Sequence, residues 1–174
     1  MIELITGGVK SGKSSYALKL ALSRKQKSRF FIATAEALDE EMTERINKHK
    51  QERGNRFETI EEPLDVPESL LQLPQNSVCV IDCITLWISN LMHHKRTDLI
   101  HRLIDVLNST SCDVIIVTNE VGMGIVPANK LARRYTELLG ETNARIAEIS
   151  DRVTLMISGI PVTIKGGLNN GIIR

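Results

Sequence analysis

The stretch Gly7-Gly8-Val9-Lys10-Ser11-Gly12-Lys13-Ser14, "GGVKSGKS" in one-letter code, decides the fold of this chain. It follows the apolar run "IELIT" (2–6) and precedes "SSYALKLALSRK" (14–25), which has the composition of a helix. The eight residues fit the pattern G-x-x-x-x-G-K-[ST], and they stand between a predicted strand and a predicted helix, as the function of that pattern requires. The stretch is therefore predicted to be a P-loop that binds an oligophosphate.

Each part of the motif has a physical role. Glycines let the backbone curl so that amide N–H groups point inward, and the N-terminus of the following helix adds partial positive charge. Lys13 would neutralise phosphate oxygens, and Ser14 would offer its hydroxyl to Mg²⁺. A glycine-rich turn without a ligand is the alternative, but the flanking strand and helix favour nucleotide binding.

Strand-like runs recur along the chain and are separated by longer segments with helical periodicity. They lie at 2–6, 29–34, 77–82, 113–118 and 152–158. This alternation predicts an α/β fold: a single P-loop NTPase-like domain spanning 1–174, with a mainly parallel sheet covered by helices on both faces. The last run and "VTIK" (162–165), joined through Gly159-Ile160-Pro161, predict an antiparallel edge hairpin. The segment 54–76 is expected to cross the surface as a loose connection.

Composition narrows the classes of partner. The 174 residues hold 22 Lys plus Arg against 21 Asp plus Glu, a balance that argues against nucleic acid or an anionic membrane as the partner. No apolar run approaches the ~20 residues that span a bilayer, so a cytoplasmic protein is expected. Cys79, Cys83 and Cys112 lack the spacing of metal ligands and are predicted to be small buried core residues.

Asp82 ends the predicted strand 77–82, where a Walker-B carboxylate would complete a magnesium site with Ser14. Its alternative role is that of a strand-end turn former. The N-K-x-D motif of signalling GTPases is not matched, because neither Asn47–Lys50 nor Asn129–Ala132 ends in Asp. A Ras-like switch is therefore disfavoured.

The segment 37–53 is predicted to be a helix, with His49 on an apolar face. One interpretation of His49 is a packed core histidine. The other is a nucleophile that attacks phosphorus, because Arg45 and Arg53 lie four residues on either side and would steady phosphate charge.

Several segments together resemble a known family. They are the P-loop, "IATAEALDEEMTERINKHKQER" (32–53), "VIDCITLWISNL" (80–91), "VTNEVGMGIVPANKLAR" (117–133) and "SGIPVTIK" (158–165). The chain resembles the bifunctional adenosylcobinamide kinase/adenosylcobinamide-phosphate guanylyltransferase of cobalamin biosynthesis, and the likeness runs in order from residue 1 to about 165.

The resemblance implies two activities. The first phosphorylates the aminopropanol hydroxyl of adenosylcobinamide with ATP or GTP. The second transfers GMP from GTP to adenosylcobinamide phosphate through a guanylyl-histidine, with His49 and Lys13 as catalytic residues. It also implies Mg²⁺ held by Ser14 and Asp82, and a homotrimer.

Residue matching implies further nucleotide contacts beside the P-loop. They are Ala33, Thr34, Ala35, Lys50, Gln51, Glu52, Arg53, Glu61 and Asp82. Glu61 could accept hydrogen bonds from guanine N1–H and the 2-amino group, or it could be an ordinary surface carboxylate.

The stretch 117–133 is expected to shape the corrinoid or phosphate-acceptor site, with Asn119 and Glu120 as its polar contacts and Pro127 at a helix start. A structural turn or a subunit contact is the alternative.

Three residues depart from the family pattern: Lys48 stands where a second histidine is common, Phe57 where Trp is expected, and Asp82 where Glu is expected. Two other functions stay open at this point. One is a P-loop small-molecule kinase without a covalent GMP intermediate, and the other is a GTP-sensing binding module.

Overall fold

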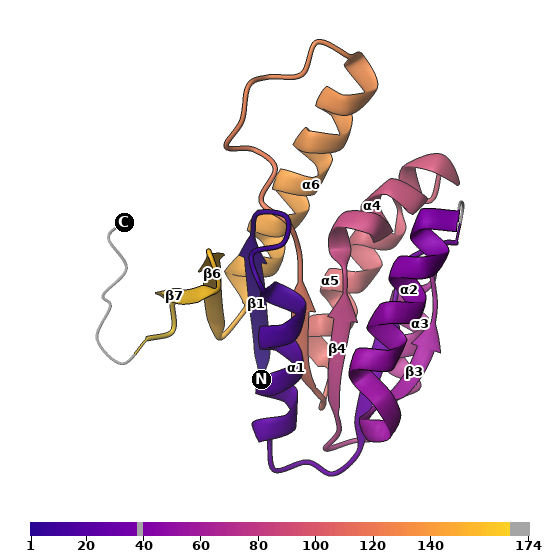
Figure 1. The fold of residues 1–174 in the computed structure, drawn as a ribbon, viewed down its shortest axis with the longest axis vertical. Coiled ribbons are helices and arrows are strands. Elements are labelled where there is room, and N and C mark those ends of the chain that lie inside the picture. Colours follow the sequence, from indigo (N-terminus) through magenta and orange to yellow (C-terminus); the bar gives the residue numbers. More distant parts are fainter. Residues whose placement is uncertain (38–39, 168–174) are drawn as a thin grey trace.

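The computed structural model describes residues 1–37 and 40–167, apart from some side chains within one helix (Glu41, Arg45, Lys48, His49 and Glu52). Seven strands form one sheet in the order β3-β2-β4-β5-β1-β6-β7 (Figure 1). Their bounds are β1 Ile2–Gly7, β2 Arg29–Ala33, β3 Glu58–Glu61, β4 Val78–Asp82, β5 Asp113–Val117, β6 Arg152–Ile157 and β7 Ile160–Lys165. All neighbouring strands pair in parallel except β6 and β7. The predicted α/β class is therefore confirmed.

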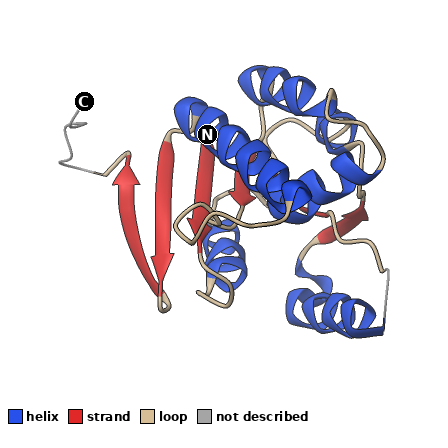
Figure 2. Ribbon diagram, turned by 90° about the horizontal axis from the view of Figure 1, so that it is seen from above, coloured by secondary structure: helices blue, strands red, loops and turns tan. Residues whose placement is uncertain are grey.

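Helices cover both faces of this sheet (Figure 2). They are α1 Lys13–Ser23, α2 Glu40–Arg53, α3 Val66–Leu71, α4 Ile84–His93, α5 Leu99–Ser109 and α6 Lys130–Ile149, with a short 3₁₀ turn η1 at Gly54–Arg56. None of the helices within 1–37 and 40–167 has the length and apolar character that a bilayer-spanning helix requires.

Alternation along the strands divides the interior into two cores. Neighbouring residues point to opposite faces of a strand, so Leu4 packs in the core beneath α3 to α6 while Ile5 packs in the core beneath α1. Both residues are buried. Because each central strand is apolar on both faces, the sequence shows continuous apolar runs, as a sheet covered on both sides demands.

The segment 54–76 is more ordered than expected. It contains β3 at the edge of the sheet and the short helix α3, whose Val66 and Leu70 are buried. The β3 strand has only one apolar residue, Ile60, because an edge strand buries little of its surface. The prediction of a loose crossing was wrong for these residues, since both elements are too short to give a periodic pattern.

The edge hairpin is confirmed, but its turn lies elsewhere. Ser158 and Gly159 form a two-residue turn with φ values of 50° and 84°, while Ile160 and Pro161 already belong to β7. Positive φ at both turn residues matches the backbone twist that favours tight hairpins.

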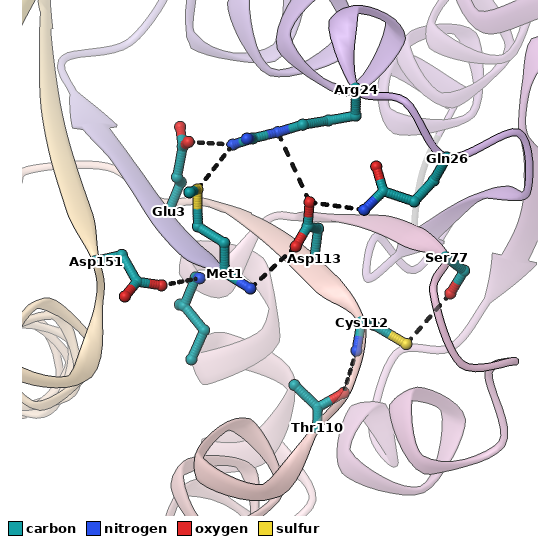
Figure 3. Close-up of polar contacts among 10 residues, drawn as sticks. Met1, Glu3, Arg24, Gln26, Ser77, Thr110, Cys112, Asp113 and Asp151 are labelled. Carbon is teal, nitrogen blue, oxygen red and sulfur yellow. Dashed lines mark hydrogen bonds and ion pairs between the residues drawn. The ribbon is translucent and has the colours of Figure 1, made fainter.

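At the amino-terminal edge of the sheet, polar side chains tie the strands together (Figure 3). Arg24, just after α1, pairs with the buried Glu3 of β1, and its Nε lies 4.0 Å from Asp113 Oδ2 of β5. Gln26 Nε2 also donates to Asp113 Oδ2 (2.9 Å), and Asp151 accepts from Ile2 N (2.7 Å). The edge away from the P-loop is therefore closed by ion pairs and hydrogen bonds.

We predict that Gly7→Ala destabilises the protein by about 2–3 kcal/mol, because Gly7 has φ 145° and an added Cβ would lie 2.4 Å from Met156 O. Urea unfolding measures the change. The matched control is Gly140→Ala within α6, where an added Cβ meets nothing within 4 Å, and this change should stabilise by about 0.5–1 kcal/mol. Equal effects of the two substitutions would contradict the close approach at Gly7.

Candidate nucleotide site

The P-loop lies at the carboxyl end of β1. The strand ends at Gly7, and α1 begins at Lys13, with Gly12 as its N-cap in the left-handed conformation (φ 93°). The Lys13 side chain is only 7% exposed, and its Nζ donates to Gly8 O (2.6 Å) and Ser11 Oγ (3.4 Å). The ammonium group therefore lies across the loop, where phosphate oxygens would meet it.

Two other segments brace this loop. Glu120 N, just after β5, donates to Gly7 O (3.1 Å), and Gly159 N of the hairpin turn donates to Ser11 O (3.1 Å). The conformation of the P-loop thus depends on both neighbours of β1 in the sheet.

Beside the P-loop, a pocket opens at the carboxyl edge of the sheet. Its walls come from α1, α2, β2, β4 and the start of α4. The lining residues are Ser14, Phe31, Ala33, Ala35, Met42, Ile46, Arg53, Asp82, Cys83 and Leu86. The pocket thus brings together several residues that the sequence placed in the nucleotide site, including both expected magnesium ligands.

The donor set around Ser14 and Asp82 fits magnesium. A hydroxyl and a carboxylate line one pocket, and Mg²⁺ typically takes one or two such ligands together with phosphate oxygens and water. Within the described ranges there is no cluster of three His, Cys, Asp or Glu residues of the kind that holds a metal by protein ligands alone.

Arg53 is held on one wall of the pocket by aromatic rings. Its guanidinium lies 4.0 Å from the centre of the Phe31 ring, and Phe57 packs edge-on against Phe31 with ring centres 6.4 Å apart. Arg53 is only 3% exposed. Phe57, the aromatic departure from the family pattern, thus supports the ring beneath this cation.

The structure also pairs two of the predicted nucleotide contacts with each other. Lys50 of α2 forms an ion pair with Glu61 at the end of β3. Gln51 of the same helix is exposed. His49 and Glu52 lie in α2 as well, but their side chains are outside the part of the structure that is described.

Thr34, the centre of the predicted Ala33-Thr34-Ala35 contact, is fully buried. Its Oγ1 donates to Cys83 O (2.8 Å) and accepts from Cys83 N (2.8 Å). The hydroxyl joins the ends of β2 and β4, so the Thr34 side chain has a structural role, whereas Ala33 and Ala35 face the pocket.

The loop after β5 begins with Asn119 and Glu120, which we call its root, and hydrogen bonds hold both residues in place. Asn119 N donates to Thr85 Oγ1 (2.8 Å), and Asn119 O accepts from Asn143 Nδ2 (3.1 Å). Glu120 Oε1 accepts from Gly122 N (2.8 Å). Asn119 and Glu120 thus stand at the same edge of the sheet as the P-loop but do not line the pocket described above.

Beyond this root the loop is exposed and apolar. Ile125 is 97% exposed, and Met123 and Val126 are also exposed. The following helix begins at Lys130 rather than at Pro127, because Asn129 Oδ1 caps it by accepting from Leu131 N (2.7 Å) and Ala132 N (3.2 Å). The prediction that Pro127 marks the helix start was therefore wrong.

Sequence reasoning missed the hydrogen-bonding residues behind the site. Thr85 and Asn90 of α4 and Asn143 of α6 bind backbone groups of segments far away in the sequence. A polar residue on the buried face of an apolar helix was the available signal, and Asn90 in "LWISNL" shows it.

This fold and loop define a P-loop nucleotide-binding protein. Among solved structures, an ATPase from the type III secretion system of pathogenic bacteria matches with a TM-score of 0.56 at 9% sequence identity. The match covers 93% of this chain and 56% of that chain. The flagellar accessory protein FlaH from Methanocaldococcus jannaschii has a TM-score of 0.50 at 13% identity, covering 94% of this chain and 77% of that one. At such low identities these neighbours show the fold alone.

Sequence comparison identifies the family. The family described as "Cobinamide kinase / cobinamide phosphate guanyltransferase" matches residues 3–164. The chain is 38% identical to the bifunctional adenosylcobalamin biosynthesis protein CobP of Pseudomonas aeruginosa, covering 95% of this chain and 98% of that protein. It is 37% identical to CobU of Salmonella typhimurium, covering 95% of this chain and 100% of that protein. The chain therefore belongs to the cobinamide kinase/cobinamide phosphate guanylyltransferase family, and it is a bifunctional enzyme of cobalamin biosynthesis.

The cysteines provide a test of the pocket. Cys79 and Cys112 are buried, as predicted, and burial together with the neighbouring Cys112 raises the pKa of the Cys79 thiol. Cys83, in contrast, is half-buried: it packs against the core beneath α1 and also lines the pocket, so the predicted full burial was wrong there.

We expect N-ethylmaleimide at pH 8 to modify Cys83 first, because Cys79 and Cys112 are buried. The raised pKa of the Cys79 thiol also leaves that residue little of the reactive thiolate. GTP should slow this modification by shielding the pocket. Peptide mapping by mass spectrometry, with Cys83→Ser as the control, measures both effects. Equal labelling of Cys79, or no protection by GTP, would contradict the pocket assignment.

Proposed function

We propose that the P-loop and the adjoining pocket form one nucleotide site that serves both reactions, and that His49 carries GMP between them. The observation that supports this proposal best is the shared pocket, where Ser14 of the P-loop helix, Asp82 of β4 and Arg53 of the helix that bears His49 meet. The sheet order and the family support a single kinase/guanylyltransferase domain over residues 1–174.

In the kinase reaction, the cobinamide hydroxyl oxygen attacks the γ-phosphorus of ATP or GTP. The bond from that phosphorus to the β–γ bridging oxygen breaks, the nucleoside diphosphate leaves, and the hydroxyl proton is released. The P-loop amides and Lys13 stabilise the charge that builds on the phosphate oxygens. The position of Lys13 Nζ, within 2.6 Å of Gly8 O, supports this role because the ammonium already lies over the loop.

We propose that Ser14 and Asp82 would be the protein ligands of a bound Mg²⁺. When bound, Mg²⁺ neutralises charge on the phosphates of the nucleotide. The protein's contribution is to hold the hydroxyl and the carboxylate on the same side of the P-loop, where they line one pocket.

In the guanylyltransferase reaction, a ring nitrogen of His49 attacks the α-phosphorus of GTP, and the bond to pyrophosphate breaks. A phosphate oxygen of cobinamide phosphate then attacks the same phosphorus, the P–N bond breaks, and the neutral imidazole is restored. Arg53, four residues after His49 in α2, would steady the phosphate charge in both steps. Its stacking on Phe31 supports this role, because the ring restricts the guanidinium to the pocket wall.

Guanine recognition is proposed for Glu61, whose carboxylate can accept from both guanine N1–H and the 2-amino group. Lys50 supports the assignment, because its ion pair with Glu61 draws that carboxylate toward α2. Ala33 and Ala35 would contact the nucleoside from the pocket wall, with Gln51 and Glu52 as further contacts from α2.

For the acceptor, we propose Asn119 and Glu120 as polar contacts beside the apolar loop tip. Exposed Met123, Ile125 and Val126 offer a surface suited to a large corrinoid. A homotrimer is a further proposal. Apolar side chains left exposed on the β6–β7 hairpin, among them Ile160 and Ile164, support an association between copies.

The covalent intermediate can be tested by intact-protein mass spectrometry after incubation with GTP and Mg²⁺. The unchanged protein should gain the mass of one guanylyl group, and His49→Ala should not, because it lacks the nucleophile. His101→Ala is the matched control, since His101 lies on α5, and it should gain the same mass.

Phosphorylation of adenosylcobinamide by His49→Ala should remain within about threefold of the unchanged protein, because the kinase reaction needs no histidine adduct. A guanylyl adduct on His49→Ala would contradict the assignment. Loss of both activities with native unfolding behaviour would contradict the separation of the two roles.

A further inference from the structure

Asn90 of α4 holds two separate segments of the site through one amide group. Its Nδ2 donates to Thr34 O (2.8 Å), just after β2, and to Pro63 O (3.1 Å), just after β3. The residue is 7% exposed and does not line the pocket, so it touches the site only from behind.

Each of the two segments is itself tied to the ends of the strands. Thr34 N donates to Asp82 O (3.3 Å), and the Thr34 hydroxyl exchanges hydrogen bonds with Cys83. The segment after β3 is joined to the end of β2 by strand pairing, in which Ala33 lies opposite Glu61. Asn90 adds a side-chain link further along both segments, between Pro63 and Thr34.

The segment after β3 is fixed by further contacts from the same helix and from itself. Trp87 Nε1 donates to Leu64 O (2.7 Å), one turn before Asn90. The Glu62 carboxylate accepts from Leu64 N (2.9 Å) and Asp65 N (2.8 Å), and Glu62 N donates to Ala33 O (3.0 Å). This stiff turn begins at the residue that directly follows Glu61.

We infer that Asn90 is a positioning residue for guanine selectivity: by tying Pro63 to Thr34, it holds the turn that follows Glu61 and, together with the pairing of β2 and β3, fixes the place of the Glu61 carboxylate relative to the nucleotide pocket. This inference rests on the proposed guanine contact of Glu61. A carboxylate favours guanine over adenine because guanine offers the N1–H and 2-amino donors, whereas adenine N1 is an acceptor and adenine has no 2-amino group. The discrimination is greatest when both bonds form at once, and that requires a defined position of the carboxylate relative to the base.

An amide is the group that this place requires. Its two N–H bonds serve two carbonyl oxygens without bringing a charge into the interior. A carboxylate would face both carbonyls with lone pairs, and an apolar side chain would leave both without this donor. Asn90→Asp and Asn90→Leu therefore remove the link by two different chemical routes, and both keep the same number of side-chain heavy atoms with the same branch at Cγ.

The experiment measures kcat and KM of nucleotidyl transfer to cobinamide phosphate with GTP and with ATP. Both Asn90 variants should lower the preference for GTP over ATP by about tenfold, chiefly through a higher KM for GTP, as expected from two weakened hydrogen bonds to the base. Leu107→Ala in the core under α5 is the control, because it lowers stability without touching the site and should leave the preference unchanged.

The Glu61→Gln variant tests whether Asn90 affects the preference for GTP through Glu61. If Asn90 acts through Glu61, the double variant Glu61→Gln/Asn90→Leu should have no lower GTP preference than Glu61→Gln alone. Unchanged preference in both Asn90 variants, or equal losses with GTP and ATP, would overturn the inference, and so would additive effects in the double variant. An unchanged protein that transfers no GMP would count instead against the proposed function.

Discussion

The close approach of β1 to β6 at Gly7 is the constraint on which the site depends. An added Cβ at Gly7 would lie 2.4 Å from Met156 O, so the strand can end there only with glycine. From that point the backbone leaves the sheet as the P-loop, and it is held by hydrogen bonds from Glu120 N and Gly159 N. The position of Lys13, and through α1 the position of Ser14, follows from this one contact between backbones.

A second dependence runs through α4. Thr85, in the first turn of this helix, accepts from Asn119 N at the root of the loop after β5. Asn90, near its other end, donates to the segments after β2 and β3. One helix therefore contacts the proposed acceptor loop through Thr85, lines the nucleotide pocket with Leu86 and holds the segments after β2 and β3 through Asn90, so its orientation affects all three. The Thr34 hydroxyl, bonded to Cys83 directly before the helix, fixes where it begins.

The features that the sequence predicted well were local ones. The P-loop and the central strands are read from residues within one stretch, because a glycine-rich turn and a doubly covered strand each leave a signature in composition. The place of Asp82 as the last residue of such a strand was predicted for the same reason, while its role as a magnesium ligand stays a prediction. In contrast, β3 and the true hairpin turn were missed, because a four-residue edge strand and a Ser-Gly turn carry little pattern. The link made by Asn90 could not be predicted, since its partners lie 56 and 27 residues away and are backbone carbonyls. His49 stays a prediction that rests on the family resemblance and its spacing from Arg53.

The loop after β5 combines a root held by hydrogen bonds with a tip of exposed apolar side chains. At the root, Glu120 N donates a hydrogen bond to Gly7 O at the end of β1. At the tip, the side chains of Met123, Ile125 and Val126 belong to neither hydrophobic core. The two parts therefore differ in what a substitution costs the fold. Substitutions at the exposed tip cost the fold little, whereas substitutions at the root disturb the hydrogen bonds that hold the P-loop. With the tip at the proposed acceptor site, such a division would let the acceptor change while the chemistry at the nucleotide is retained.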